Sequence, residues 1–201
     1  MTISFFLQAL FNLIADPATQ KPASAALDSY LENLGDQIIR YLPLLMERLL
    51  ILLDNAPLPV RSTIVGAIGS AAHAAEKDFI PYFEATVARI QPFLQLQAEG
   101  EERQLRGITT DTLGTIAEAV GKDLFRPLMQ STLKVAFEAL ELDESKLRES
   151  TFMFFATIAS LFTEEFTPYL PTAMEALVTA CERAETNDGE YHPSLHPIIS
   201  F

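Results

Sequence analysis

Short phrases of similar sequence recur along this chain at intervals of about 40 to 46 residues. Each phrase carries one large apolar residue in an equivalent place: Ile38, Phe79, Phe125 and Phe166. This interval is typical of arrays of helix pairs, in which each unit buries its apolar side only against its neighbours. The chain is therefore expected to work through an extended surface, so we look for stripes of side chains before pockets.

The segments between these apolar anchors have the pattern of paired helices. Apolar residues recur at spacings of three and four, and no alternating strand pattern is present. The first (A) helices are expected at about 3–15, 40–55, 80–97, 126–141 and 168–184, and the second (B) helices at about 20–36, 58–76, 102–121 and 145–163. We predict an all-α fold, a HEAT-repeat α-solenoid of antiparallel helix pairs with about four and a half repeats.

The predicted array spans residues 1–185. Its repeats are expected at about 1–38, 39–79, 80–125 and 126–166, followed by a half repeat at 167–185. The proline-rich residues 186–201 do not continue the pattern and are expected to form a loop or a disordered tail.

Proline and glycine mark the expected helix ends. Pro81, Pro127 and Pro168 are predicted to begin A helices, where a missing amide hydrogen costs little. Pro92 falls inside the third A helix and should kink or split it. Glycines, Gly121 among them and Gly35 at the equivalent place earlier, should close B helices.

The B helices align without gaps on three arginines, Arg61, Arg106 and Arg148. The positions that follow alternate large and small residues: Ile68, Leu113 and Phe155, then Gly69, Gly114 and Ala156, and later Ala72, Ala117 and Ala159. Large residues would fill the interface while small ones let neighbouring backbones approach. We expect the arginines to pair with acidic residues of the preceding turns, namely Asp54, Glu101 or Glu102, and Asp143, and not to form an anion site.

Composition limits the chemistry. The chain has 14 basic and 27 acidic residues, a net charge of −13, which argues against a nucleic-acid partner and fits a basic partner or simple solubility. No apolar run is long enough to predict a membrane partner. No phosphate loop, cysteine pair or nucleophile motif is present, so neither an enzyme nor a cofactor is predicted. His192 and His196 have metal-like spacing, but adjacent prolines break the helix that would align them, and no metal site is predicted.

The exposed side of the B helices is the best candidate for a binding surface, because one helix layer of such an array lines its concave face. The positions predicted to stack from repeat to repeat are Ser29, Glu32, Asp36, Ser70, His73, Asp111, Thr115, Glu118 and Thr157. A small, hydroxylated surface flanked by acids suits an extended peptide that carries lysines or arginines. The alternative for any one of these residues is an ordinary solvated helix face.

Several phrases resemble a known family. Residues 34–50, 60–75 and 105–125, and above all Leu147–Phe155 with Phe166–Pro171, are similar to the middle HEAT repeats of importin-β (karyopherin-β) superfamily nuclear transport receptors, closest to the branch of importin four and its fungal counterpart. The resemblance implies an armadillo-like superhelix that shuttles between cytoplasm and nucleus through the nuclear pore. It also implies basic import signals of ribosomal protein or histone cargo on the concave face, and Phe-Gly nucleoporins and GTP-bound Ran as partners of the full-length receptor.

The chain is accordingly expected to be a fragment of an import receptor, without the N-terminal arch that binds Ran. The alternative is a HEAT-repeat scaffold subunit that assembles a multiprotein complex. Such a scaffold would bind its partners through the turns that carry Asp54, Glu101 and Asp143, whereas a receptor would use the B-helix stripe.

Overall fold

The computed structural model describes residues 2–16, 18–34, 37–142 and 144–187. Every regular element in these ranges is helical. The α-helices are α1 (Thr2–Ala15), α2 (Gln20–Leu34), α3 (Ile38–Asn55), α4 (Leu58–Ala75), α5 (Phe83–Ile90), α6 (Glu101–Val120), α7 (Lys122–Ala139), α8 (Ser145–Phe162) and α9 (Leu170–Asn187). Short 3-10 helices are η2 (Glu76–Tyr82), η3 (Gln91–Gln95) and η4 (Thr167–Tyr169).

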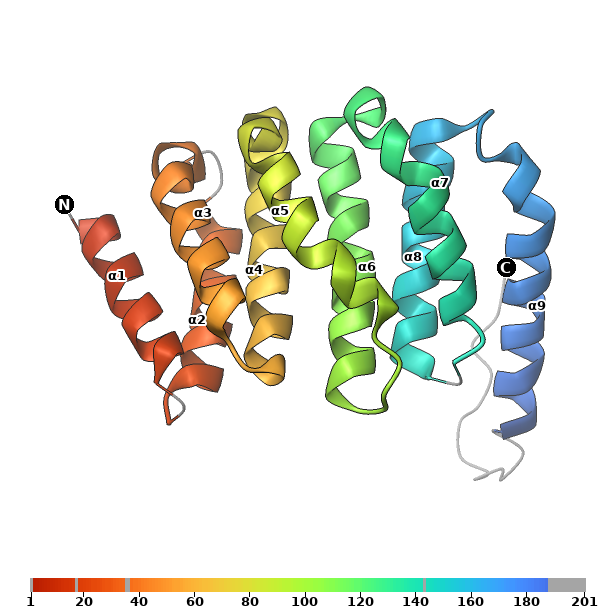
Figure 1. Cartoon of the computed structure of the whole chain (residues 1–201), viewed down its shortest axis with the longest axis horizontal. Helices are drawn as coiled ribbons and strands as arrows, with labels where there is room; N and C mark the ends of the chain where they lie inside the picture. Colours follow the sequence, from red (N-terminus) through yellow and green to blue (C-terminus); the bar gives the residue numbers. More distant parts are fainter. Residues whose placement is uncertain (1, 17, 35–36, 143, 188–201) are drawn as a thin grey trace, which may run out of the picture.

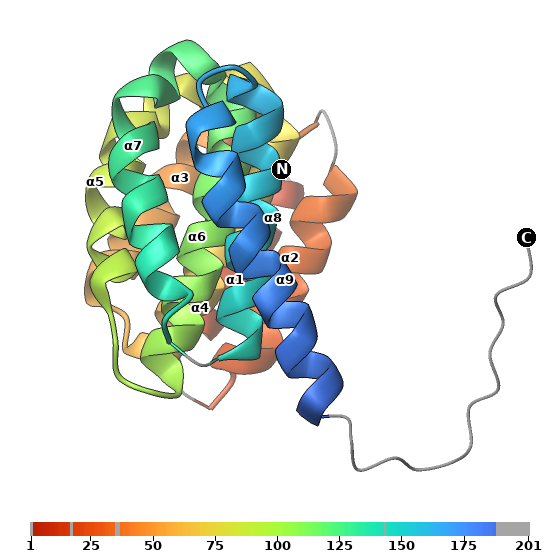
Figure 2. The same cartoon turned by 90° about the vertical axis from the view of Figure 1, so that its right-hand side faces the viewer.

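The helices form a row with α1 at one end and α9 at the other (Figure 1). Seen along the row, α3, α5 and α7 make up one layer, the A layer, and α4, α6 and α8 lie beside them in a second layer, the B layer (Figure 2). Each A helix runs antiparallel to the B helix that follows it (Figure 1). The predicted all-α HEAT-repeat solenoid is confirmed.

The repeated apolar anchors are buried where the helices meet. Ile38, Phe79 and Phe125 have no exposed surface, and Phe166 is 3% exposed. Ile38 and Phe125 lie at the start of an A helix, Phe79 lies in the short helix before α5, and Phe166 directly precedes the short helix before α9. Burial of one such side chain contributes about 1.5–3 kcal/mol, which explains why the same place in each repeat keeps a large apolar residue.

The two layers are packed unequally. Helix α6 lies along both α4 and α8 in extensive contact, whereas α3 and α5 touch over a short length and α5 and α7 hardly meet. Small residues explain the close approach in the B layer. A methyl group on Gly69 would come within 3.1 Å of Thr112 Oγ1, and one on Gly114 within 3.5 Å of the Phe154 ring. Thr112 Oγ1 also donates a hydrogen bond to the Val65 carbonyl across this contact, at 3.2 Å.

Three B helices end in the same way. Glu76, Gly121 and Thr163 follow α4, α6 and α8, and all have positive φ, at 46°, 82° and 32°. Each lies fifteen residues after an aligned arginine. Their amides donate to the carbonyls of the three aligned alanines, Ala72, Ala117 and Ala159. Gly121 therefore closes its helix as predicted, while the other two helices accept a strained non-glycine residue. Gly35 lies outside the described residues.

The prolines agree with the prediction only in part. Helix α5 ends at Ile90 and η3 begins at Gln91, so Pro92 does split the third A helix. Pro127, however, lies inside α7, which already starts at Lys122, so the prediction that it begins the helix is wrong. Because proline has no amide hydrogen, the carbonyl of Asp123, four residues earlier, receives no hydrogen bond from position 127. Asp123 is exposed near the helix start, so water can supply that hydrogen bond.

Two other predicted helix starts also shift. Pro81 lies in η2, two residues before α5 begins, and Pro168 lies in η4, before α9. A 3-10 turn accommodates the rigid proline ring before the regular helix starts. At the other end, α9 extends to Asn187, so residues 186 and 187 are helical and do not belong to the predicted tail. Residues 188–201 lie outside the described part of the chain.

Two of the aligned arginines, Arg61 and Arg106, are structural, but the predicted partners of both are wrong. Arg106 is 3% exposed and donates to the carbonyls of Leu96, at 3.1 Å, and Val135, at 2.9 Å. The Arg61 guanidinium lies 5.7 Å from the centre of the Phe93 ring.

The acids expected beside the arginines have other roles. Asp54 pairs with Arg89, and Glu102 accepts a hydrogen bond from the Ala98 amide. Asp143 lies outside the described residues. The arginine side chains of α4 and α6 are long enough to reach the A-layer side of the array. They therefore contact the Phe93 ring and the carbonyls of Leu96 and Val135, and not the acidic residues of the preceding turns.

Gly114 tests the close approach of α6 and α8. We expect Gly114→Leu to destabilise the fold by about 1–3 kcal/mol, because the larger side chain would overlap Phe154. Gly114→Ala should be neutral or stabilising by up to about 1 kcal/mol, since its methyl group fits and alanine favours a helix. Urea unfolding of both variants checks this. Equal stability of Gly114→Leu and the unmodified chain would contradict the packing.

Arg106 tests the link between the layers. Arg106→Met keeps the length of the side chain but removes both hydrogen bonds, so we expect a loss of about 1–3 kcal/mol or more from the unpaired carbonyls. The matched control is Lys134→Met, whose exposed ion pair with Glu138 is worth about 0.5 kcal/mol or less. Denaturant unfolding that gives the two variants the same loss would show that Arg106 has no structural role.

Candidate functional site

Five of the predicted stripe residues line one groove between α4 and α6. Ser70, His73, Asp111 and Thr115 line a hollow of about 280 Å³, and His73, Thr115 and Glu118 line a second hollow of about 250 Å³. The two hollows share His73 and Thr115, so they form one continuous surface, which we call the α4–α6 groove. Equivalent positions on neighbouring B helices meet here because the helices are parallel and closely packed.

Of the other predicted residues, Ser29 and Thr157 do not line this groove. Ser29 is exposed on α2, and Thr157 is half-buried on α8, where it lies beside Gly114. Glu32 belongs to α2, but its side chain is not described, and Asp36 lies outside the described residues. The structure thus brings together residues from two adjacent repeats and leaves Ser29 and Thr157 apart from them.

The groove has a floor of small residues. Gly66 and Gly69 lie on it, and the space above Gly66 is open for at least 4 Å from where a methyl group would be. The hydroxyl of Ser70 donates to the Gly66 carbonyl at 3.3 Å, and that of Thr115 donates to the Asp111 carbonyl at 3.4 Å. Because each hydrogen is used within its own helix, the hydroxyl oxygens offer lone pairs to a donor in the groove.

The groove is acidic. Although Asp111 is exposed, desolvation by the surrounding protein raises the pKa of its carboxyl, and the nearby charge of Glu149 on α8 raises this pKa further. Glu118 and Glu76 add exposed carboxylates in the second hollow, where Lys77 is the opposing charge. A donor with positive charge would relieve the repulsion that Asp111 experiences.

Three of these charged residues were missed by the sequence reasoning. Glu76 and Lys77 lie just past the end of α4, outside the helical register that was used to find the stripe. Glu149 directly follows the aligned Arg148, and only the packing of α8 against α6 brings its charge near Asp111. Repeat spacing could have placed Glu149 on the same face of its helix as the stripe. It cannot give the shift of α8 along α6 that brings Glu149 near Asp111.

Other kinds of site were sought in the described part of the chain. No group of three or more His, Cys, Asp or Glu side chains there is arranged to hold a metal ion. His192 and His196 lie outside the described residues. Within the described ranges, no helix combines the length and the apolar character needed to cross a membrane.

Asp111 gives a test of the electrostatics. Its pKa in the folded chain should lie above the ordinary value of 3.8, so its ionisation opposes folding: the stability it contributes is present below pH 3.8 and is lost as the pH rises through the folded pKa. NMR titration of its carboxyl carbon measures the value. Glu149→Gln should lower this pKa towards 3.8, while Glu101→Gln, at the far end of α6, should leave it unchanged. An Asp111 pKa at or below 3.8 would refute this account of the groove.

Comparison with known proteins gives consistent matches. A family profile described as importin subunit beta-1-like, TPR repeats, matches residues 18–195. The probable importin subunit beta-4 of Schizosaccharomyces pombe is 40% identical over 185 residues, which cover 90% of this chain and 17% of that protein. Human importin-4 is 34% identical over 121 residues, covering 59% of this chain and 11% of that protein.

A solved structure agrees in fold. The crystal structure of the karyopherin Kap121p bound to the extreme C-terminus of the protein phosphatase Cdc14p superposes with a TM-score of 0.71 at 25% identity, covering 84% of this chain and 16% of that one. This chain thus spans about a sixth of the length of the relatives that it matches along most of its own length. The profile match over most of the sequence, with the identity to the fission yeast protein, shows that the chain belongs to the importin-β family of nuclear transport receptors.

Proposed function

We propose that this chain is a cargo-binding part of a nuclear import receptor and holds basic segments of cargo proteins in the α4–α6 groove. The observation that carries this proposal is the convergence of Ser70, His73, Asp111, Thr115 and Glu118 on one acidic surface with a small-residue floor. The cargo segments are those of ribosomal protein or histone type. Ser29, Glu32, Asp36 and Thr157 would extend the same surface along the B layer.

The packing of the layers supports the side of the molecule chosen for cargo. The B helices lie closer together than the A helices. In a curved array the closely spaced layer is the inner one, so the B layer is expected on the concave side. An extended cargo segment could then cross several B helices at once, gaining one set of contacts from each.

The chemistry of the groove favours lysine and arginine side chains. Asp111 and Glu118 would accept hydrogen bonds from an ammonium or guanidinium group, and the hydroxyl oxygens of Ser70 and Thr115 would accept further ones. Because Gly66 has no side chain and the space above it is open, a peptide backbone could approach the helices there. The net charge of −13 would attract basic segments from a distance at low ionic strength.

The relatives support the wider role. Two of them carry the name importin, and a solved relative holds the extreme C-terminus of another protein, which is a linear segment. For the whole receptor we propose shuttling between cytoplasm and nucleus, with Phe-Gly nucleoporins and GTP-bound Ran as its other partners. These activities belong to a protein about six times longer than this chain.

The proposal is tested by reversing charges in the groove. Asp111→Lys with Glu118→Lys should weaken binding of a lysine-rich import peptide by about tenfold or more, which corresponds to about 1.4 kcal/mol. Fluorescence anisotropy with a labelled peptide measures this. In the unmodified chain, the affinity should fall steeply as salt is raised.

The matched control is Glu101→Lys with Glu102→Lys, which makes the same change of charge on the same helix but in its first turn, beside the loop from η3. A receptor should keep most of its peptide affinity in this control. If the turn variants lose binding while the groove variants retain it, the function is that of a scaffold that binds through its turns. If neither pair affects binding, the groove is an ordinary solvated surface.

A further inference from the structure

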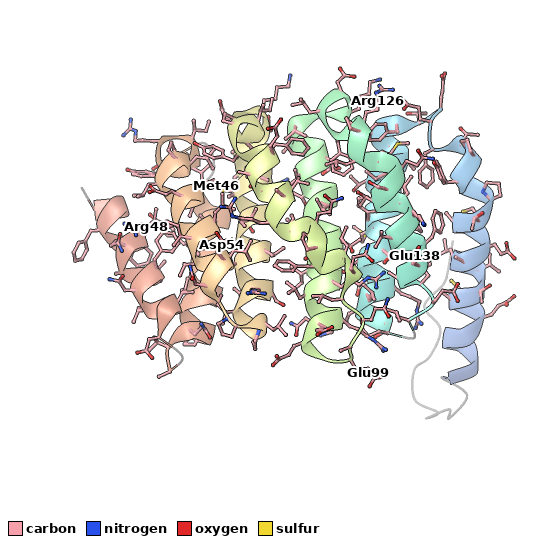
Figure 3. The ribbon with its side chains drawn as sticks, in the orientation of Figure 1. Met46, Arg48, Asp54, Glu99, Arg126 and Glu138 are labelled. Carbon is pink, nitrogen blue, oxygen red and sulfur yellow. The ribbon has the colours of Figure 1, made fainter. Side chains whose placement is uncertain are left out.

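Two ion pairs cross the loosely packed A layer. Arg89 on α5 contacts both carboxylate oxygens of Asp54 at the end of α3, at 3.1 and 3.2 Å from its Nε. Arg126 on α7 contacts Glu165, in the turn before η4 and α9, at 2.5 Å. The first pair therefore joins one repeat to the next, and the second joins α7 to the turn that leads into the half repeat. Asp54 lies on the A-layer side of the array and Arg126 at the edge where α7 begins (Figure 3).

Both arginines are held in position by a second contact. Arg89 also donates to the carbonyl of Ala85 in its own helix, at 3.0 Å, and Arg126 lies 3.4 Å from Asp123. These contacts restrict the rotamers of the arginines before they meet their partners, which lowers the entropy lost on pairing. Two further ion pairs, Arg103 with Glu99 and Lys134 with Glu138, join residues only four apart and cannot link repeats.

The position of the bridging pairs matters because the A helices make few contacts with one another. In the B layer, the spacing of α4, α6 and α8 is fixed by buried side chains and by glycines that allow close contact. In the A layer, α3 and α5 share little surface, and few contacts join α7 to α9. If the A helices moved apart or together while the B helices kept their spacing, the curvature of the array would therefore change.

We propose that the Asp54–Arg89 and Arg126–Glu165 pairs are electrostatic clasps that set the spacing of the A layer and so the curvature of the array. All four side chains are between 38% and 49% exposed, so salt can screen them, whereas the apolar B layer is much less sensitive to salt. The curvature of this protein is thus expected to depend on ionic strength. This inference concerns the free chain and does not rest on the proposed cargo function.

The test is a pair of distance measurements with spin labels, each crossing one clasp. Labels at Glu47→Cys on α3 and Gln130→Cys on α7, with Cys181→Ser, span the Asp54–Arg89 clasp. Labels at Gln130→Cys and the native, exposed Cys181 on α9 span the Arg126–Glu165 clasp. Pulsed electron resonance gives the distribution of distances for each pair, and circular dichroism checks that each variant keeps its helices.

At low salt, Arg89→Gln should broaden the α3–α7 distribution and lengthen its mean by about 1–2 Å or more, the size of ordinary helix shifts, and leave the α7–α9 distribution unchanged. Arg126→Gln should do the reverse. Raising the salt from about 0.01 M to about 1 M, which shortens the screening length from about 30 Å to about 3 Å, should move the unmodified chain towards the variants. Lys134→Gln, the control, should change neither distance. Distributions of Arg89→Gln and Arg126→Gln that superimpose on those of the unmodified chain would overturn the proposal.

Discussion

The structure depends on the close approach of neighbouring B helices. Gly69 packs on Thr112 and Gly114 packs on Phe154, and in both places the missing side chain is what allows the helices to touch. This contact buries the apolar residues that follow each aligned arginine and fixes the register between one repeat and the next. A repeat has no core of its own, so its stability comes from such an interface with its neighbours.

The same contact produces the two contrasting faces. On the solvent-facing side of the B layer, the contact between α4 and α6 places Asp111 and Thr115 beside Ser70 and His73, and so forms the α4–α6 groove. On the A side, the helices are left further apart, and the Asp54–Arg89 and Arg126–Glu165 pairs cross the gaps between them. A firmly packed layer beside a loosely joined one is the arrangement on which we base the proposed change of curvature.

Much of this architecture could be predicted from the sequence. The anchor Phe125 and its equivalents gave the repeat, and helix periodicity gave the paired helices to within a few residues. Errors arose where one residue has several possible partners. Arg106 was expected to bind an acid of its own turn but reaches carbonyl groups at Leu96 and Val135, 10 and 29 residues away. Pro127 was expected to begin a helix that in fact starts at Lys122.

The sequence by itself determined the class of fold, the repeat length and the faces of each helix, because these follow from local spacing and from burial of the apolar residues. Only the tertiary structure decided which stripe residues meet. The offset between α6 and its neighbours brings Asp111 near Glu149 and joins it to Ser70, while Ser29 and Thr157 remain apart from that groove. That offset depends on how side chains of different helices interlock, and such contacts between distant residues are not encoded in the periodicity of either helix.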